Sequence, residues 1–135
     1  MSEKLGLQRI IWQDINSNTI NLLAITNDMT ESEFLQYSEN LFSYIEDAID
    51  AGSWDLDTEI SGNVLTIETD SGEKIIINRH MPNQELWIAA KSGGYHFVYR
   101  QNQWLSTRDG SEFFSILSQI LSTAYGEEIQ LTAFR

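Results

Sequence analysis

Cysteine is absent from this sequence and basic side chains are scarce, and each shortage excludes a class of function. None of the 135 residues is cysteine, which excludes disulfide scaffolds, thiolate metal sites such as zinc fingers, and cysteine nucleophiles. Lysine and arginine together number 8 against 20 aspartates and glutamates, which gives a net charge of −12. This charge disfavours nucleic acids and anionic membrane surfaces, because proteins bind both mainly through basic side chains. Metal cations and basic protein surfaces remain as partners.

Long apolar runs and catalytic signatures are absent as well. No hydrophobic stretch reaches the length of a membrane span, and the N-terminus lacks the pattern of a secretory signal, so we expect a cytoplasmic protein. The segments "DSGEK" and "SGGYH" have the character of hairpin turns rather than of phosphate-binding loops. No Ser-His-Asp combination has a supporting context. We therefore expect that the protein is not an enzyme.

What is present indicates one folded domain preceded by an extension. Hydrophobic residues make up 41% of the chain, enough for a sizeable core. Residues 1–28 show no clean periodicity, whereas Thr30 and Glu33 have the spacing of a helix capping box. We expect residues 1–28 to be either a poorly ordered extension or no part of the native protein, with Met29 as the initiator. Residues 29–135 would form the domain.

The hydrophobic periodicity of the domain predicts a helix, a series of strands and a second helix. Helical spacing runs from Thr30 to about Ala51, where Gly52 occupies a position that often needs a positive φ. It returns from Ser111 to Tyr125 and stops at Gly126. Between the helices, an alternating pattern predicts strands at 57–61, 64–69, 73–79, 85–91, 95–100 and 104–106. Their short glycine-containing connections favour antiparallel pairing. The expected fold is an α+β two-layer sandwich, with both helices on one face of an antiparallel sheet of about six strands.

Acidic residues are concentrated in the first half of the chain. Between Ile10 and Glu73 there is no lysine or arginine, while fourteen aspartates and glutamates accumulate. On the first predicted helix, the solvent-facing side carries Glu39, Glu46, Asp47 and Asp50. Such a surface attracts cations and basic proteins. The alternative is an acidic face that serves only solubility.

A large aromatic side chain is predicted on the open face of the sheet. If Leu86 and Ile88 face the helices, then Trp87 points to solvent, where an aromatic side chain is a common binding anchor. A one-residue slip of register, or coverage by the N-terminal segment, would bury Trp87 instead. His80 and His96 have no partner at metal-ligand spacing, so we expect neither to be a ligand.

One series of residues resembles a known family. The segment "SGNVLTIETDSGEKIIINRHMPNQELWIAAKSGGYHF", together with the acidic helix before it and "WLSTRDGSEFFSIL" after it, resembles the bacterial frataxins of the CyaY family. The resemblance runs from about Met29 to Leu131. It implies a small helix–sheet–helix protein that binds iron weakly through an acidic ridge. It also implies a role in iron–sulfur cluster assembly, with the cysteine desulfurase and the scaffold protein as partners.

The resemblance also assigns residues to these roles. The implied metal ligands are Glu46, Asp47, Asp50, Asp55, Asp57 and Glu59. The expected partner-binding residues are Glu39, Glu46, Asp50, Asn78 and Trp87. The sequence departs from the family pattern at "AGSW", where members often have more acids, and at His80 and Glu85, where glutamine is common. These departures imply fewer bound ions and altered contacts at the sheet surface.

Three functions follow from these expectations. The first is an iron donor or sensor that regulates the desulfurase–scaffold complex, as a monomer able to form iron-dependent oligomers. The second is an acidic regulator that only binds protein and has no functional metal site. The third is an iron-oxidising or iron-storing protein that assembles into larger particles. Weak iron oxidation is also compatible with the first function as a side activity.

Overall fold

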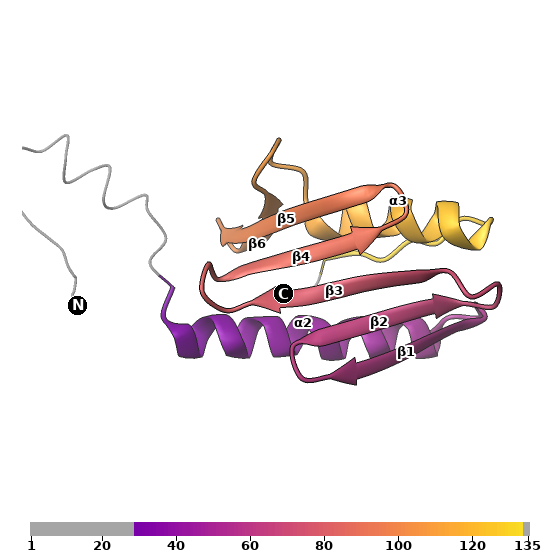
Figure 1. The fold of residues 1–135 in the computed structure, drawn as a ribbon, viewed down its shortest axis with the longest axis horizontal. Helices are drawn as coiled ribbons and strands as arrows, with labels where there is room; N and C mark the ends of the chain where they lie inside the picture. Colours follow the sequence, from indigo (N-terminus) through magenta and orange to yellow (C-terminus); the bar gives the residue numbers. More distant parts are fainter. Residues whose placement is uncertain (1–28, 134–135) are drawn as a thin grey trace, which may run out of the picture.

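The computed structural model describes residues 29–133, which form two layers. The order along the chain is α2 (Glu31–Ala51), β1 (Leu56–Ser61), β2 (Val64–Thr69), β3 (Lys74–His80), β4 (Glu85–Ala90), β5 (Gly93–Arg100), β6 (Gln103–Ser106) and α3 (Phe113–Tyr125). The strands form one six-stranded antiparallel sheet in sequence order, and both helices cover the same face of it (Figure 1). The expected α+β sandwich is confirmed, whereas the predictions for residues 1–28 lie outside the described part.

Helix α2 begins with the predicted capping box. The Thr30 hydroxyl accepts a hydrogen bond from the Glu33 backbone N–H at 3.0 Å, and the Glu33 carboxylate accepts one from the Thr30 N–H at 2.9 Å. The helix does not end as predicted, because Gly52 has φ −79° rather than a left-handed conformation. A Cβ atom at Gly52 would collide with the indole ring of Trp54, which packs on it. Glycine is needed here for this close approach, not for a positive φ.

The strands differ from their predicted bounds by one or two residues at most. The largest difference is at β5, which begins at Gly93 rather than Tyr95, because Gly93 and Gly94 pair with Ala90 and Ala89 of β4. The connection between β4 and β5 is therefore the short turn at residues 91–92. The β4–β5 ladder is therefore two residue pairs longer than predicted.

Helix α3 begins two residues later than predicted. The Ser111 carbonyl accepts a hydrogen bond from the Ser106 N–H at 2.8 Å, which keeps Ser111 beside β6 and outside the helix. Glu112 is the N-cap, and its carboxylate accepts from the N–H groups of Phe114 and Ser115. The helix ends at Gly126 with φ 88°, as the left-handed end requires.

The hydrophobic core lies between the helices and the sheet. Alternate strand residues enter it, so that Leu86 is 0% and Ile88 is 1% exposed, while Trp87 between them lies on the other face. This confirms the predicted register of β4. Within residues 29–133, no helix is both long and apolar enough to cross a bilayer.

Candidate functional site

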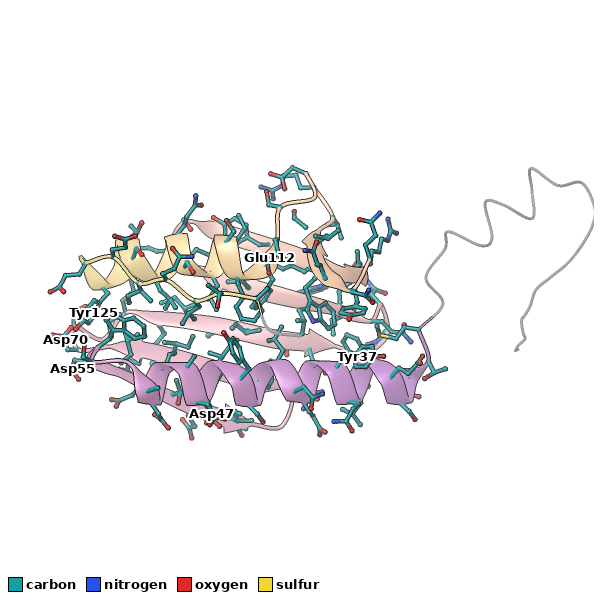
Figure 2. The ribbon with its side chains drawn as sticks, turned by 180° about the vertical axis from the view of Figure 1, so that it is seen from behind. Tyr37, Asp47, Asp55, Asp70, Glu112 and Tyr125 are labelled. Carbon is teal, nitrogen blue, oxygen red and sulfur yellow. The ribbon has the colours of Figure 1, made fainter. Side chains whose placement is uncertain are left out.

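The helical part of the predicted metal site lies on the solvent side of α2. Glu46 is half-buried, and Asp47 and Asp50 are exposed. Asp47 lies on the side of α2 that is turned away from α3 (Figure 2). The opposite side of the same helix is buried against the strands through residues such as Leu41 and Ile45, each 0% exposed. Core packing therefore fixes the direction of these carboxylates.

The remaining predicted ligands follow the chain around the edge of the sheet. Asp55 lies in the connection from α2 to β1, and its backbone N–H donates to the Tyr125 hydroxyl at 3.0 Å. Asp57 and Glu59 are exposed on β1, the edge strand. Since Leu56 of β1 is buried toward the helices, Asp57 and Glu59 point to the open face of the sheet.

The six predicted ligands are thus distributed over a helix, a turn and the far side of a strand. Within residues 29–133, no three acidic or histidine side chains come together as a metal-binding group. The arrangement is an open acidic surface rather than a closed cage. Any cation held there would retain water among its ligands and would bind with modest affinity.

Two acidic residues that the sequence did not single out belong to the same surface. Glu68 of β2 is paired directly with Asp57 across the ladder. Asp70 follows Thr69, the partner of Leu56, and lies beside Asp55 at the end of the sheet (Figure 2). The strand register would have revealed both, because it places them next to predicted ligands. We call the combined surface the acidic edge, and it consists of Glu46, Asp47, Asp50, Asp55, Asp57, Glu59, Glu68 and Asp70.

Trp87 lies at the centre of the open sheet face, between two histidine rings. Its indole stacks on His80 at 4.2 Å between ring centroids and on His96 at 4.3 Å, with interplanar angles of 10° and 5°. The indole N–H donates to the Glu85 carboxylate at 2.7 Å, and Nδ1 of His96 lies 3.7 Å from the same oxygen. Trp87 is therefore half-buried by its neighbours and held in one orientation.

The two residues that depart from the family pattern, His80 and Glu85, are part of this arrangement. They lie opposite each other on β3 and β4. Asn78, a predicted partner-binding residue, is the cross-strand neighbour of Trp87. Asn78 and Trp87 therefore form one patch. We call it the tryptophan patch, and it consists of Asn78, His80, Glu85, Trp87 and His96.

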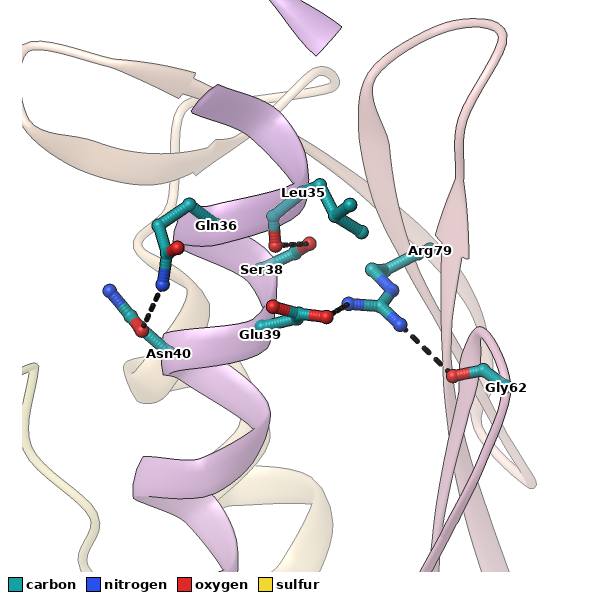
Figure 3. A network of polar contacts seen from close by, with 7 residues as sticks. All are labelled: Leu35, Gln36, Ser38, Glu39, Asn40, Gly62 and Arg79. Carbon is teal, nitrogen blue, oxygen red and sulfur yellow. Dashed lines mark hydrogen bonds and ion pairs between the residues drawn. The ribbon is translucent and has the colours of Figure 1, made fainter. Parts of the chain in front are cut away.

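Glu39 differs from the other predicted partner-binding acids because it has a basic neighbour. Nη1 of Arg79 lies 3.9 Å from its carboxylate, and Nη2 of Arg79 donates to the Gly62 carbonyl at 3.0 Å (Figure 3). The Arg79 guanidinium lies 5.0 Å from the ring centroid of Phe42, and the residue is 8% exposed. Arg79 was not identified from the sequence. Its position two and four residues after the inward-facing Ile77 and Ile75 was the available signal.

Comparison with known proteins supports the resemblance. A family model described as a frataxin-like domain matches residues 27–127. The iron–sulfur cluster assembly protein CyaY of Neisseria meningitidis serogroup B is 58% identical over 103 residues, which cover 76% of this chain and 96% of that protein. The protein of the same name from Chromobacterium violaceum is 57% identical over 99 residues, covering 73% and 94% respectively.

Solved structures agree with this result. Frataxin from Psychromonas ingrahamii superposes with a TM-score of 0.73 at 33% identity, covering 78% of this chain and all (100%) of that one. Trimeric frataxin from Saccharomyces cerevisiae, complexed with ferrous iron, superposes with a TM-score of 0.57 at 26% identity, covering 84% and 100%.

Proposed function

Since the chain belongs to the frataxin-like family, we propose that it is an iron–sulfur cluster assembly protein of the bacterial cytoplasm. In this proposal it binds iron weakly at the acidic edge and docks on the cysteine desulfurase and the scaffold protein. The observation that carries the proposal is the position of the acidic edge. The acidic edge adjoins the open sheet face that displays Trp87. Among the described residues paired with its acids on β1 and β2, only Lys74, opposite Glu68, is basic.

Iron is the cargo of this surface rather than a resident cofactor. Carboxylate oxygens are suitable ligands for iron ions. Because the acids lie along a ridge, they offer few ligands at any one point and little geometric selectivity. Weak binding suits a protein that senses iron or passes it on. The ferrous complex of the yeast frataxin supports iron as the metal.

Partner binding would use the same charges together with the tryptophan patch. A cluster of unneutralised carboxylates speeds association with a basic surface and orients it. The stacked Trp87 supplies a rigid aromatic anchor, which loses little conformational freedom on binding. Iron at the acidic edge would cancel part of its charge and so weaken docking to a basic partner. This gives a physical route by which iron regulates the desulfurase complex.

A second candidate is a regulator that binds only protein. One observation favours it: within residues 29–133 no three potential ligands converge. The two candidates differ in their response to iron. In the first, iron changes the affinity for the desulfurase; in the second, only salt does.

The test is the affinity of the full chain for a purified bacterial cysteine desulfurase, measured without oxygen at low and high salt, with and without ferrous iron. We expect affinity to fall with salt and with iron, and Trp87→Ala to weaken it at every salt concentration. The double variant Asp47→Asn/Asp50→Asn should weaken it and reduce its iron dependence. Glu31→Gln is the matched control for the single variant Asp50→Asn, since each removes one charge from the same helix, at sites about 28 Å apart. An affinity indifferent to both salt and iron would contradict the proposal.

A further inference from the structure

Two histidines cover both faces of the Trp87 indole in the tryptophan patch. The ring centroids of His80 and His96 lie 4.2 and 4.3 Å from that of Trp87, with the rings nearly parallel. His96 lies directly opposite Trp87 on β5, and its side chain is 46% exposed. The indole therefore leaves its edge, rather than a face, for other contacts, and a change of charge on either imidazole acts directly on Trp87.

One carboxylate oxygen joins Trp87 to His96. Oε1 of Glu85 accepts a hydrogen bond from the indole N–H at 2.7 Å, and Nδ1 of His96 lies 3.7 Å from the same oxygen. A neutral imidazole forms no ion pair with a carboxylate, whereas a protonated one is positive and carries an N–H on each ring nitrogen. Protonation of His96 would therefore offset the charge of Glu85 and compete with the indole N–H for Oε1.

His80 is a poorer site for a proton, although it stacks on the same indole. Its Nδ1 is buried and, within residues 29–133, has no hydrogen-bond partner. A protonated imidazole carries an N–H at this atom, and a buried donor without an acceptor is costly. The two histidines thus differ: His96 can accept a proton beside a carboxylate, whereas His80 mainly supports the indole by stacking.

Few other charges act on His96. Arg108 follows Thr107, whose N–H donates to the His96 carbonyl at 2.9 Å, and Nη2 of Arg108 lies 3.5 Å from the Gly94 carbonyl. Arg108 therefore opposes Glu85, because it repels a protonated imidazole. The other charged residues described on the open face or at its rim have backbone positions about 13 Å or more from that of His96, beyond the screening length of about 8 Å. They are Asp57, Glu59, Glu68, Lys74, Lys91 and Arg100.

We propose that His96 is a proton sensor that adjusts docking at the tryptophan patch between pH 8 and pH 5, the range in which an imidazole changes its charge. Near pH 8 the patch carries the negative charge of Glu85 and suits a basic partner. As the pH falls, a protonated His96 offsets this charge, so the attraction for a basic partner weakens. The sensing step belongs to this chain alone, and only its effect on docking rests on the proposed function.

The sensing step is tested by NMR titration of the full chain alone from pH 8 to pH 5. We expect the indole N–H resonance of Trp87 to move together with the ring resonances of His96, because both groups share Oε1 of Glu85. His96→Gln should abolish this movement, whereas the matched variant His80→Gln should retain it. The proposal would be overturned by an indole resonance that stays fixed in the wild type, that moves equally in His96→Gln, or that no longer moves in His80→Gln.

The effect on docking is measured as affinity for the desulfurase at pH 8 and pH 6. Between these values the affinity of the wild type should fall about threefold more than that of His96→Gln, because only the wild type gains a positive charge at the patch. Comparing the two proteins removes the contribution of groups that titrate on the partner. An identical pH dependence in both would overturn the control of docking by His96, even where salt and Trp87→Ala act as the proposed function requires. Absence of binding at every pH would refute the proposed function and the effect on docking with it, and the NMR titration would still decide whether His96 senses protons.

Discussion

The substitution Asp57→Asn should stabilise the protein while weakening its interaction with iron. Asp57 and Glu68 lie directly opposite each other on β1 and β2, and side chains in such a pair have Cβ atoms about 5 Å apart. Two like charges at this separation repel by about 0.8 kcal/mol in water. At physiological salt, where the screening length is about 8 Å, roughly half of this remains. Asp57→Asn should therefore raise the free energy of unfolding by about 0.4 kcal/mol.

The neighbouring carboxylate provides an internal comparison. Glu68 is paired with Asp57 on one side and with Lys74 on the other. Glu68→Gln removes a repulsion and an attraction together, so the free energy of unfolding should change by less than about 0.3 kcal/mol. The two substitutions alter the net charge equally, and only the local pairing distinguishes them.

Thermal unfolding at several salt concentrations measures both effects. Asp57→Asn should raise Tm by about 2–3 °C at physiological salt, by more at low salt, and hardly at all near 1 M salt, where the screening length is about 3 Å. A gain that does not change with salt would mean that packing rather than charge is responsible. Destabilisation by Asp57→Asn at low salt would refute the view that repulsion between the carboxylates of the acidic edge lowers the free energy of unfolding.

Two further predictions concern groups outside the acidic edge. Arg79→Met should leave the free energy of unfolding within about 1 kcal/mol of the wild type, because Nε and Nη1 of the buried guanidinium lack hydrogen-bond partners. Arg79→Ala should lower it by about 2–4 kcal/mol, because the packing of the buried side chain is lost. Glu39→Gln should cost less than about 1 kcal/mol, since the Glu39 side chain is 55% exposed. Urea unfolding measures the stability of all three variants. A loss from Glu39→Gln equal to that from Arg79→Ala would contradict this, because the ion pair would then be a major source of stability. Burial and, less strongly, Tyr37 raise the pKa of Tyr99, so its contribution to stability is complete below the phenol value of 10.0 and is lost as pH rises through the folded-state pKa. Tyr99→Phe should therefore flatten the decline of Tm above pH 10, and an identical alkaline slope in both proteins would contradict this.

The features predicted correctly from the sequence are those determined by local patterns. Thr30 and Glu33 define the start of α2 because a capping box is a contact within four residues. The alternating pattern predicts the faces of Leu86, Trp87 and Ile88 correctly, because one side of the sheet is buried and the other is open. Gly52 shows the limit of this approach, since its role depends on the position of the Trp54 ring rather than on the helix pattern.

The features missed from the sequence depend on contacts between distant segments. Glu68 joins the acidic edge only through its pairing with Asp57, which requires the strand register. The approach of Arg79 to Glu39 requires the packing of β3 against α2. The hollow lined by Tyr37, Tyr99 and Phe114 brings together side chains from three separate segments. No periodicity within one segment indicates such a hollow.

The most direct test of the central claim is an anaerobic titration of the full chain with ferrous iron, followed by backbone NMR. Paramagnetic iron broadens the signals of nearby residues, so the pattern of broadening locates the metal. We predict broadening confined to the second half of α2 and the β1–β2 hairpin around the acidic edge, including Asp57 and Glu68, with Tyr37 at the other end of α2 unaffected. Absence of broadening at millimolar iron, or broadening centred elsewhere, would contradict the claim and leave the acidic edge as a surface for protein docking alone.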